Sequence, residues 1–308
     1  MSDWSPNRAL KALQQFLAEF GLREPAVQLV SFRQTAIYRL PGIGASLRVY
    51  GPGEDTMRGD RMIALAKYLA ETDFPAIRLH PDFVSQPIDL AGLKASVWQW
   101  IEADRLPTDA DLRFGRLLRS LHDMPVDSSL ALPSFDPVRT VRQRLDRLER
   151  ERKVRPEDIA CLKVSLARAI DMGGELRASR LGSGLIHGDA MPGNMIISHG
   201  AAVLIDLDSG AWGGREWDLV PMAVVAKRFD ASHERWNRFV AGYGADPRDF
   251  SGFEAATLIK QLTMTTYLCL SAGHSAEIDA EIRSRLRMWR EWDLVGQWRS
   301  GFTVAAND

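Results

Sequence analysis

The spacing of apolar residues changes along the chain. Apolar residues beginning with Leu10 and Leu13 recur at helical intervals and predict an N-terminal helix. Ser5 is placed to cap the start of this helix, and Gly21 ends it. Further on, the apolar residues occur in short β-favouring runs separated by turn residues, the pattern of antiparallel strands. A helix is expected between the third and fourth runs, at residues 61–70. The expected strands are residues 27–31, 36–40, 46–50, 83–88 and 94–101.

Helical spacing returns after Asp104 and dominates the rest of the chain. Thr108 is expected to cap the first of these helices. Residues 185–208 interrupt the pattern with two short apolar runs joined by His199-Gly200, which predicts a β-hairpin. The helical faces carry Phe114, Leu117 and Leu121, then Val138, Val141 and Leu145, then Ile159, Leu162 and Leu166, then Leu258 and Leu262, and finally Ile282 and Leu286.

Together these patterns predict an α+β fold with a small β-rich lobe at residues 1–101 and a larger, mostly helical lobe at residues 102–308. A chain of 308 residues is long enough for two such units. Lys and Arg total 39 and Asp and Glu total 40. The resulting net charge of −1 argues against a general nucleic-acid or membrane-surface binder.

The cysteines and the N-terminal segment favour a cytoplasmic protein. Cys161 and Cys269 lie far apart in apolar surroundings, without the spacing of a disulfide framework or a metal site. Lys11 and Glu19 interrupt the first helix, which makes it unlike a signal peptide. No apolar stretch reaches the roughly 18 residues of a membrane span, so no membrane partner is expected.

The segment at residues 185–219 carries the candidate chemistry. Asp189 lies in a His-Gly-Asp triplet, Asn194 follows five positions later, and Asp206 follows a short apolar strand. Phosphoryl transfer requires a carboxylate that orients the attacking hydroxyl and oxygen ligands that hold Mg²⁺ on the phosphates. Asp189 is therefore the candidate catalytic residue, and Asn194 and Asp206 are the candidate metal ligands. The spacing matches the kinase loop H-R-D-x-x-x-x-N, with Gly188 in place of Arg.

The sequence HGDAMPGN at residues 187–194, followed by LIDLDSGAWGGREWDL at residues 204–219, resembles the catalytic motif of the aminoglycoside phosphotransferase family. The resemblance extends loosely over residues 20–270. It implies a bilobal protein-kinase-like fold and a small-molecule kinase that uses ATP, with GTP as an alternative, and Mg²⁺. It also implies that His187 and Asp218 are structural, and that Asp218 braces the catalytic loop through its backbone.

The same resemblance assigns nucleotide-binding residues in the β-rich lobe. The backbone groups of Gln99 and Ile101 are expected to hold the adenine, with Trp98 near the gatekeeper position. Arg48 stands where protein kinases carry their phosphate-binding lysine, and Asp60 is the candidate acidic partner on the following helix. Arginine binds phosphate through two parallel hydrogen bonds, so Arg48 is compatible with this role.

Other glycines and charges have mostly structural interpretations. The phosphate-covering loop is placed at residues 31–35, which contain no glycine, and Gly42 and Gly44 are expected to form a plain turn. A second metal-ligand role for Asp208 is the less favoured alternative, because a continuing strand would turn it to the opposite face. Basic and acidic residues alternate over residues 139–153, which predicts a solvated, salt-bridged helix face rather than an anion site.

The acceptor class stays open from the sequence. Acidic residues outnumber basic ones over residues 181–308, which makes Glu216, Glu277, Asp279 and Glu281 candidates to bind a polycation such as an aminoglycoside or another cationic antibiotic. The alternative is a kinase for a neutral or zwitterionic metabolite of choline, homoserine or amino-sugar type. A second alternative is a nucleotide-binding pseudokinase module, against which the intact catalytic and metal-binding residues argue. The sequence predicts no oligomeric state.

Overall fold

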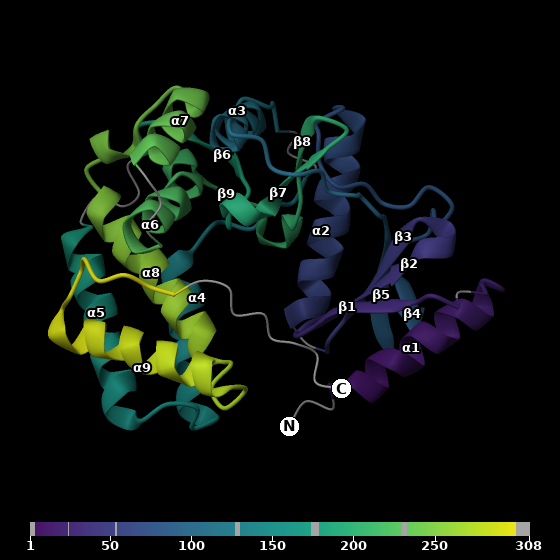
Figure 1. Cartoon of the computed structure of the whole chain (residues 1–308), viewed down its shortest axis with the longest axis horizontal. Helices are drawn as coiled ribbons and strands as arrows, with labels where there is room; N and C mark the ends of the chain where they lie inside the picture. The colour runs from purple at the N-terminus through teal and green to yellow at the C-terminus, as the bar shows by residue number, and fades with distance from the viewer. Residues whose placement is uncertain are drawn as a thin grey trace.

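The β-rich lobe is built on one antiparallel sheet. The computed structural model describes residues 4–23, 25–52, 54–126, 130–173, 179–229 and 233–299. Five strands pair in the order β1-β2-β3-β5-β4, and Figure 1 shows α1 on the side of the sheet away from the helical lobe, with α2 between the sheet and that lobe. The elements are α1 (Pro6–Glu19), β1 (Gln28–Phe32), β2 (Thr35–Leu40), β3 (Ala45–Tyr50), α2 (Glu54–Glu71), β4 (Ile88–Leu90) and β5 (Leu93–Gln99).

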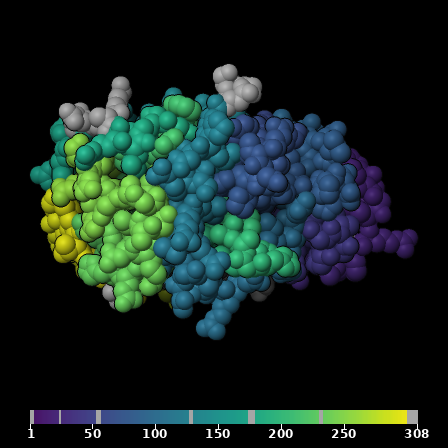
Figure 2. Space-filling view, turned by 90° about the horizontal axis from the view of Figure 1, so that it is seen from above, coloured from purple at the N-terminus to yellow at the C-terminus, as the bar shows by residue number. Residues whose placement is uncertain are grey.

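The helical lobe contains two short antiparallel ribbons, β6 with β9 and β7 with β8. Figure 2 shows the N-terminal elements at one end of the molecule and the last helix at the other. None of the helices within the described ranges is long and apolar enough to cross a membrane. The elements are α3 (Ala110–His122), α4 (Pro137–Arg150), α5 (Pro156–Met172), β6 (Ser183–Ile186), β7 (Met195–Ser198), β8 (Ala201–Leu204), β9 (Ala211–Gly214), α6 (Val220–Arg228), α7 (His233–Tyr243), α8 (Phe253–Cys269) and α9 (Ala276–Glu291).

The two N-terminal helices belong to different hydrophobic cores. α1 packs Phe16 against sheet residues such as Leu47. α2 instead buries Met62 in the core that contains Trp98 and, from the β7–β8 ribbon, Leu204. Because α2 shares this core with the helical lobe, it holds the sheet at a defined position over the catalytic segment.

Helices α3 and α7 pack against each other through glycines. A Cβ atom at Gly115 would lie 2.2 Å from the carbonyl oxygen of Phe239, and one at Gly242 would lie as close to the backbone of α3. Only glycine permits this approach of the two backbones. The contact sets the positions of His122 and Tyr243 at the ends of the two helices, next to the catalytic loop.

Most of the predicted elements are confirmed. Ser5 caps α1 by accepting the backbone N–H of Arg8, and the first three strands occur where the runs predict them. The hairpin turns at His199-Gly200, where both residues have positive φ, as a two-residue hairpin turn requires.

Three predictions of element bounds are wrong. The helix expected at residues 61–70 already begins at Glu54. The strand expected at residues 83–88 is mostly loop, because Phe83 is buried by aromatic packing against α1 rather than by strand pairing. α3 begins after Asp109 instead of Thr108, and the Asp109 carboxylate binds Arg113 rather than capping the helix. The lobe boundary at residue 101 remains a prediction.

Candidate active site

The catalytic loop after β6 passes very close to the chain at Ser209. Gly188 has a φ of +78°, and a Cβ atom there would lie 2.2 Å from the carbonyl oxygen of Ser209. Any larger residue would collide with that backbone, so only glycine fits at the position where the protein-kinase pattern has arginine. This close passage brings Asp189 and Asp208 to the same cavity.

Asp218 braces the catalytic loop. Its carboxylate is fully buried and accepts the backbone N–H groups of His187, at 2.6 Å, and Gly188, at 2.8 Å. The backbone immediately before Asp189 is thereby held in one conformation. The structural role predicted for Asp218 is confirmed.

The His187 imidazole joins the catalytic loop to the segment that leads to Asp206, the candidate metal ligand. Its Nε2 lies 2.9 Å from the carbonyl oxygen of Ile205, so Nε2 carries the proton and donates it. Its Nδ1 accepts the backbone N–H of Asp189 at 3.3 Å. Both ring nitrogens are occupied, which makes His187 a structural residue, as predicted, and not a proton acceptor in the reaction.

A second layer supports Asp218 from α3 and α7. His122 Nε2 lies 3.0 Å from Asp218 Oδ2, and His122 Nδ1 lies 2.8 Å from the hydroxyl of Tyr243. Burial raises the pKa of Tyr243, so its hydroxyl stays protonated and donates to Nδ1. Nε2 then donates to the carboxylate, and every polar atom of this buried chain has a partner.

The candidate metal ligands are Asn194, which bonds to the catalytic loop, and Asp206, which follows β8. Asn194 Nδ2 donates to the carbonyl oxygen of Asp189 at 2.8 Å, which leaves the side-chain oxygen as a ligand. Asp206 has a left-handed backbone conformation, with a φ of +61°. No group of three or more His, Cys, Asp or Glu side chains in the described ranges is able to hold a metal ion. The oxygen donors present fit Mg²⁺ that is held mainly on nucleotide phosphates, its usual arrangement.

Asp208 lies on the cavity side, contrary to the expectation that strand alternation would turn it away. The chain leaves β8 at Asp206 in the left-handed conformation, so strand alternation does not continue to Asp208. Asp208 lies 3.8 Å from Arg58 and accepts the hydroxyl of Ser209 at 3.1 Å. Burial raises the pKa of Asp208, and the nearby Asp206 carboxylate raises it further.

Arg48 reaches the site from β3. Its side chain is only 14% exposed, and Nη1 lies 3.8 Å from Asp206 Oδ1. The guanidinium lies over the Trp98 ring, 5.5 Å from its centre. Nε is buried and has no hydrogen-bond partner among the described residues. A buried cationic N–H beside Asp206, the candidate metal ligand, is a suitable donor to a phosphate oxygen.

The prediction that Asp60 is the acidic partner of Arg48 is wrong. Asp60 lies on an exposed part of α2 and pairs with Lys94 at 3.4 Å. Residues two positions apart point to roughly opposite sides of a helix. α2 therefore turns Arg58 toward the cavity and Asp60 away from it, while Arg61, one turn after Arg58, also lines the cavity.

Gln99 and Ile101 lie at the end of β5, outside the cavity that holds Asp189. The N–H of Gln99 donates to the carbonyl oxygen of Arg78 at 2.9 Å. Within the described ranges Ile101 makes no backbone–backbone hydrogen bond, so its N–H is a free donor for a ligand. Adenine binding by these two residues remains a prediction.

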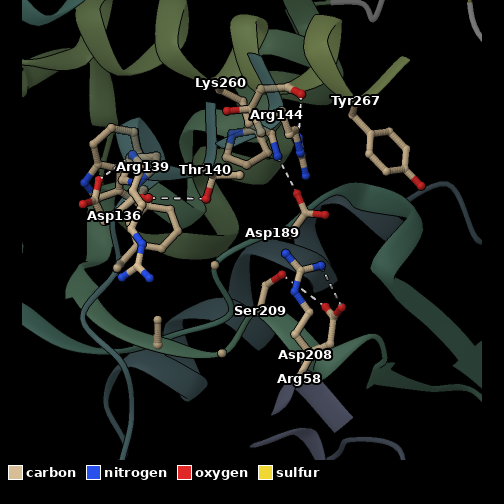
Figure 3. Close-up of a pocket in the computed structure, with 18 of the residues that line it drawn as sticks. Arg58, Asp136, Arg139, Thr140, Arg144, Asp189, Asp208, Ser209, Lys260 and Tyr267 are labelled. Atoms are coloured by element: carbon tan, nitrogen blue, oxygen red, sulfur yellow. Dashed lines mark hydrogen bonds and ion pairs between the residues drawn. The ribbon is translucent and has the colours of Figure 1, made fainter. Parts of the chain in front are cut away.

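A cavity of about 670 Å³ lies between α2, α4, α8 and the loops that carry Asp189 and Asp208. Figure 3 shows Arg144 and Lys260 reaching toward Asp189 from one wall, with Arg58 and Asp208 on the opposite side. The charged residues that line the cavity are Arg58, Arg61, Arg139, Arg144, Lys260 and Arg285, together with Asp136, Asp189, Asp206 and Asp208.

Lys260 holds the candidate catalytic carboxylate. Its Nζ lies 2.5 Å from Asp189 Oδ1, and its side chain is 12% exposed. The position of Asp189 inside the cavity disfavours its charged form, but the charge and hydrogen bond of Lys260, with smaller effects of His187 and Arg144, lower the pKa of Asp189 overall. Asp189 is therefore ionised near neutral pH and is able to orient a hydroxyl.

Replacing Lys260 by methionine is expected to raise the pKa of Asp189. The ionised carboxylate is the active form, so the acid limb of the kcat–pH profile should move to higher pH, and activity should be lost earlier as pH falls. Steady-state rates from about pH 4 to pH 8 measure this shift. Lys163→Met, which breaks a surface pair with Glu149, is the control. An unchanged acid limb in folded Lys260→Met would contradict the assigned role.

Lys260 is not among the residues that the sequence singles out. It follows Asp189 by 71 residues, and no motif connects the two. One signal is present in the sequence: Lys260 is the only charged residue of α8 beyond its first turn. A lone lysine in the middle of a largely apolar helix is costly unless it has a partner.

The prediction for the basic run at residues 139–153 is correct for one part and wrong for another. Arg147 pairs with Glu151 on the surface, as a salt-bridged face requires. Arg139 and Arg144 line the cavity instead. The same helix therefore presents one basic face to solvent and another to the site.

The four acidic residues proposed for a polycation do not line this cavity. Glu216 is buried and accepts backbone N–H groups from residues 180 and 181. Glu281 is buried against Arg285, and Glu277 and Asp279 lie in the first turn of α9. The expectation that they form the acceptor site is wrong, because their charges serve loop bracing, ion pairing and the helix start.

Comparison with known proteins identifies the family. Residues 8–257 match the model of the phosphotransferase enzyme family. The chain belongs to this family. The resemblance inferred from HGDAMPGN and the following segment is confirmed, and the chain is a phosphotransferase of the small-molecule kinase type. No curated protein sequence matches the chain.

Solved structures of phosphotransferases share the fold. The amicoumacin kinase hAmiN in complex with AMP-PNP, Ca²⁺ and Ami has a TM-score of 0.65 at 13% identity, covering 93% of this chain and 95% of that chain. Plasmodium vivax ethanolamine kinase has a TM-score of 0.61 at 16% identity, with 86% and 82% covered. The streptomycin–ATP–APH(2″)-IIa complex has a TM-score of 0.59 at 14% identity, with 94% and 97% covered. These similarities establish the protein-kinase-like fold.

Proposed function

We propose that this phosphotransferase transfers the γ-phosphate of ATP, or alternatively GTP, to a hydroxyl group of a small molecule with the help of Mg²⁺. The observation that carries the proposal is the opening of Asp189, Asp206 and Asp208 into one cavity. Arg48, with a buried N–H that has no partner among the described residues, lies beside Asp206. A catalytic carboxylate, metal-binding oxygens and a phosphate-binding cation are the parts that phosphoryl transfer needs.

In the proposed reaction the acceptor oxygen attacks the γ-phosphorus, the bond from that phosphorus to the β–γ bridging oxygen breaks, and the nucleoside diphosphate leaves. Asp189 orients the hydroxyl and takes its proton, while Lys260 keeps the carboxylate ionised beforehand. Arg48 binds phosphate oxygens. Mg²⁺ held by Asn194 and Asp206 would neutralise the phosphate charge.

Structural neighbours support a nucleotide with a divalent ion and leave the base and the acceptor open. Their structures contain AMP-PNP with Ca²⁺, ATP with streptomycin, and GDP with kanamycin. The neighbours include antibiotic kinases and choline or ethanolamine kinases, so both a resistance role and a metabolic role are compatible with the fold.

The direct test measures ADP release from Mg-ATP with a panel of hydroxylated compounds, together with thermal stabilisation by Mg-AMP-PNP. Acceptor-dependent ADP release supports the proposal. Stabilisation by the nucleotide without turnover on any acceptor would favour the pseudokinase alternative. If the nucleotide neither stabilises the protein nor is turned over, nucleotide binding is refuted altogether.

Replacing Asp206 by alanine is expected to raise the Mg²⁺ concentration for half-maximal activity at least tenfold. Loss of a residue that only supports a metal ligand commonly costs about 10- to 100-fold in affinity, and loss of a ligand should cost no less. Titration of Mg²⁺ at fixed ATP measures the effect. Asp82→Ala, at an exposed turn, is the control. An unchanged Mg²⁺ requirement in Asp206→Ala would remove Asp206 from the metal site.

A further inference from the structure

One wall of the cavity is basic and belongs to the helical lobe. Arg139, Thr140 and Arg144 line it from α4, where Thr140 and Arg144, four residues apart, lie on the same helix face. Lys260 and Tyr267 line it from α8. Figure 3 shows Arg144 and Lys260 reaching toward Asp189, so this part of the wall faces the candidate catalytic carboxylate.

The basic residues of the cavity differ in whether their charge is neutralised. Three have a carboxylate partner: Lys260 with Asp189, Arg58 with Asp208, and Arg285 with Glu281. Within the described ranges, Arg61 of α2 forms no ion pair with a carboxylate. The same is true of the two cavity-lining arginines of α4, Arg139 and Arg144. The wall around Asp189 therefore has unneutralised positive charge.

Arg144 is the more enclosed of these two arginines. It is half-buried, Nη1 donates to the carbonyl oxygen of Thr263 at 2.7 Å, and the guanidinium lies 5.1 Å from the centre of the Tyr267 ring. These contacts fix the side chain but leave other guanidinium N–H groups for a ligand. Burial lowers the pKa of Arg144 and the charge of Arg58 lowers it further, while Asp189, Tyr267 and Asp208 offset part of this. A bound anion would stabilise the charged guanidinium.

We propose that the acceptor of this phosphotransferase is an anion, whose carboxylate or phosphate group binds Arg144 while its hydroxyl lies at Asp189. Arg139 lines the same cavity from α4 and adds a second positive charge to this wall. The inference rests on the phosphotransferase function proposed above and specifies its substrate class. It replaces the polycation expected from the sequence, since a cation here would meet unpaired arginines.

The nucleotide phosphates do not account for Arg144. Arg48 comes from β3 and lies beside Asp206, while Arg58 and Arg61 line the cavity from α2. Figure 3 shows Arg58 on the side of the cavity opposite to Arg144. Arg144 reaches the cavity from the helical lobe, beside Lys260. The two sets of arginines therefore serve two anions, one on each wall.

The test compares anionic, neutral and cationic hydroxyl compounds. Glycerate and glycerol 3-phosphate are compared with glycerol, and ribose 5-phosphate with ribose; choline and kanamycin represent cations. Thermal shift of the full chain in saturating Mg-AMP-PNP measures binding, and ADP release from Mg-ATP measures transfer. We expect at least one anionic probe to stabilise the protein and to be phosphorylated, and its neutral and cationic counterparts to do neither. The carboxylate and phosphate arms identify the preferred anion.

The variants separate acceptor binding from other roles of Arg144. Arg144→Gln should raise the KM for the anionic acceptor by about 10- to 100-fold, as expected for a lost charge-assisted hydrogen bond, and leave the KM for ATP nearly unchanged. Arg144→Lys should restore part of the loss. Arg142→Gln is the matched control, because Arg142 lies on the same helix, is exposed and does not line the cavity.

Each result distinguishes this inference from the proposed function. Turnover of choline or kanamycin, with no anion bound, overturns the inference and upholds the phosphotransferase. Failure of every anion to stabilise the nucleotide complex also overturns it, as does an Arg144→Gln variant with an unchanged acceptor KM. Absence of both Mg-AMP-PNP stabilisation and turnover defeats the proposed function itself.

Discussion

Replacing Asp189 by asparagine is expected to lower kcat by about 10²- to 10⁴-fold, the usual contribution of a group that accepts a proton in the transition state. Asparagine keeps the shape of the side chain and a hydrogen-bond acceptor for Lys260, but it carries no charge and accepts no proton. Mg-ATP binding should persist, because Asp189 is not among the metal ligands proposed here. Steady-state kinetics with an acceptor and thermal shift with Mg-AMP-PNP measure the two properties separately.

The matched control is Asp136→Asn. Asp136 also lines the cavity, but its carboxylate caps α4 by accepting the N–H of Arg139 at 2.9 Å. Asparagine caps a helix about as well as aspartate, so this variant should keep nearly full activity. If Asp189→Asn were no slower than Asp136→Asn, the catalytic assignment would be lost.

The largest effect on stability is expected from Asp218→Ala. The change removes a buried carboxylate that accepts two backbone N–H groups and pairs with His122. Each buried donor left without a partner costs about 1–3 kcal/mol, so the free energy of unfolding should fall by about 3 kcal/mol or more. Activity should fall as well, because the backbone before Asp189 loses its brace. Urea denaturation followed by circular dichroism measures the stability change.

Asp123→Ala is the control for this change. Asp123 forms a surface pair with Arg119 at 2.6 Å, and such pairs contribute about 0–1 kcal/mol. If Asp218→Ala does not fold, Asp218→Asn keeps the side-chain volume and should still be clearly less stable than wild type. If Asp218→Ala and Asp218→Asn were both as stable as Asp123→Ala, the bracing contacts of Asp218 would contribute little to the free energy of unfolding.

The local parts of the fold were predictable because they depend on neighbours in sequence. The N-cap at Ser5 and the hairpin turn at His199-Gly200 are set by side chains and backbone conformations within a few residues. The buried loop at Phe83 was not predictable in this way, because aromatic packing against α1 and not strand pairing buries it.

The catalytic motif was also readable, because its residues follow one another at fixed spacing. Asp189 and Asn194 belong to one loop, and the next hairpin delivers Asp206. By contrast, Asp60 and Arg58 lie two positions apart on α2, and only the packing of that helix shows which of them faces the cavity.

The sequence by itself determined the family, the lobes and the carboxylates and amide proposed for phosphoryl transfer, since short-range patterns encode all of these. Only the tertiary structure decided which charges surround them. Lys260 lies 71 residues from Asp189, and Arg144 belongs to a helix on which Arg139 also lines the cavity but Arg147 pairs on the surface. A charge run along one helix does not show which face is buried, because burial depends on the helices packed against it.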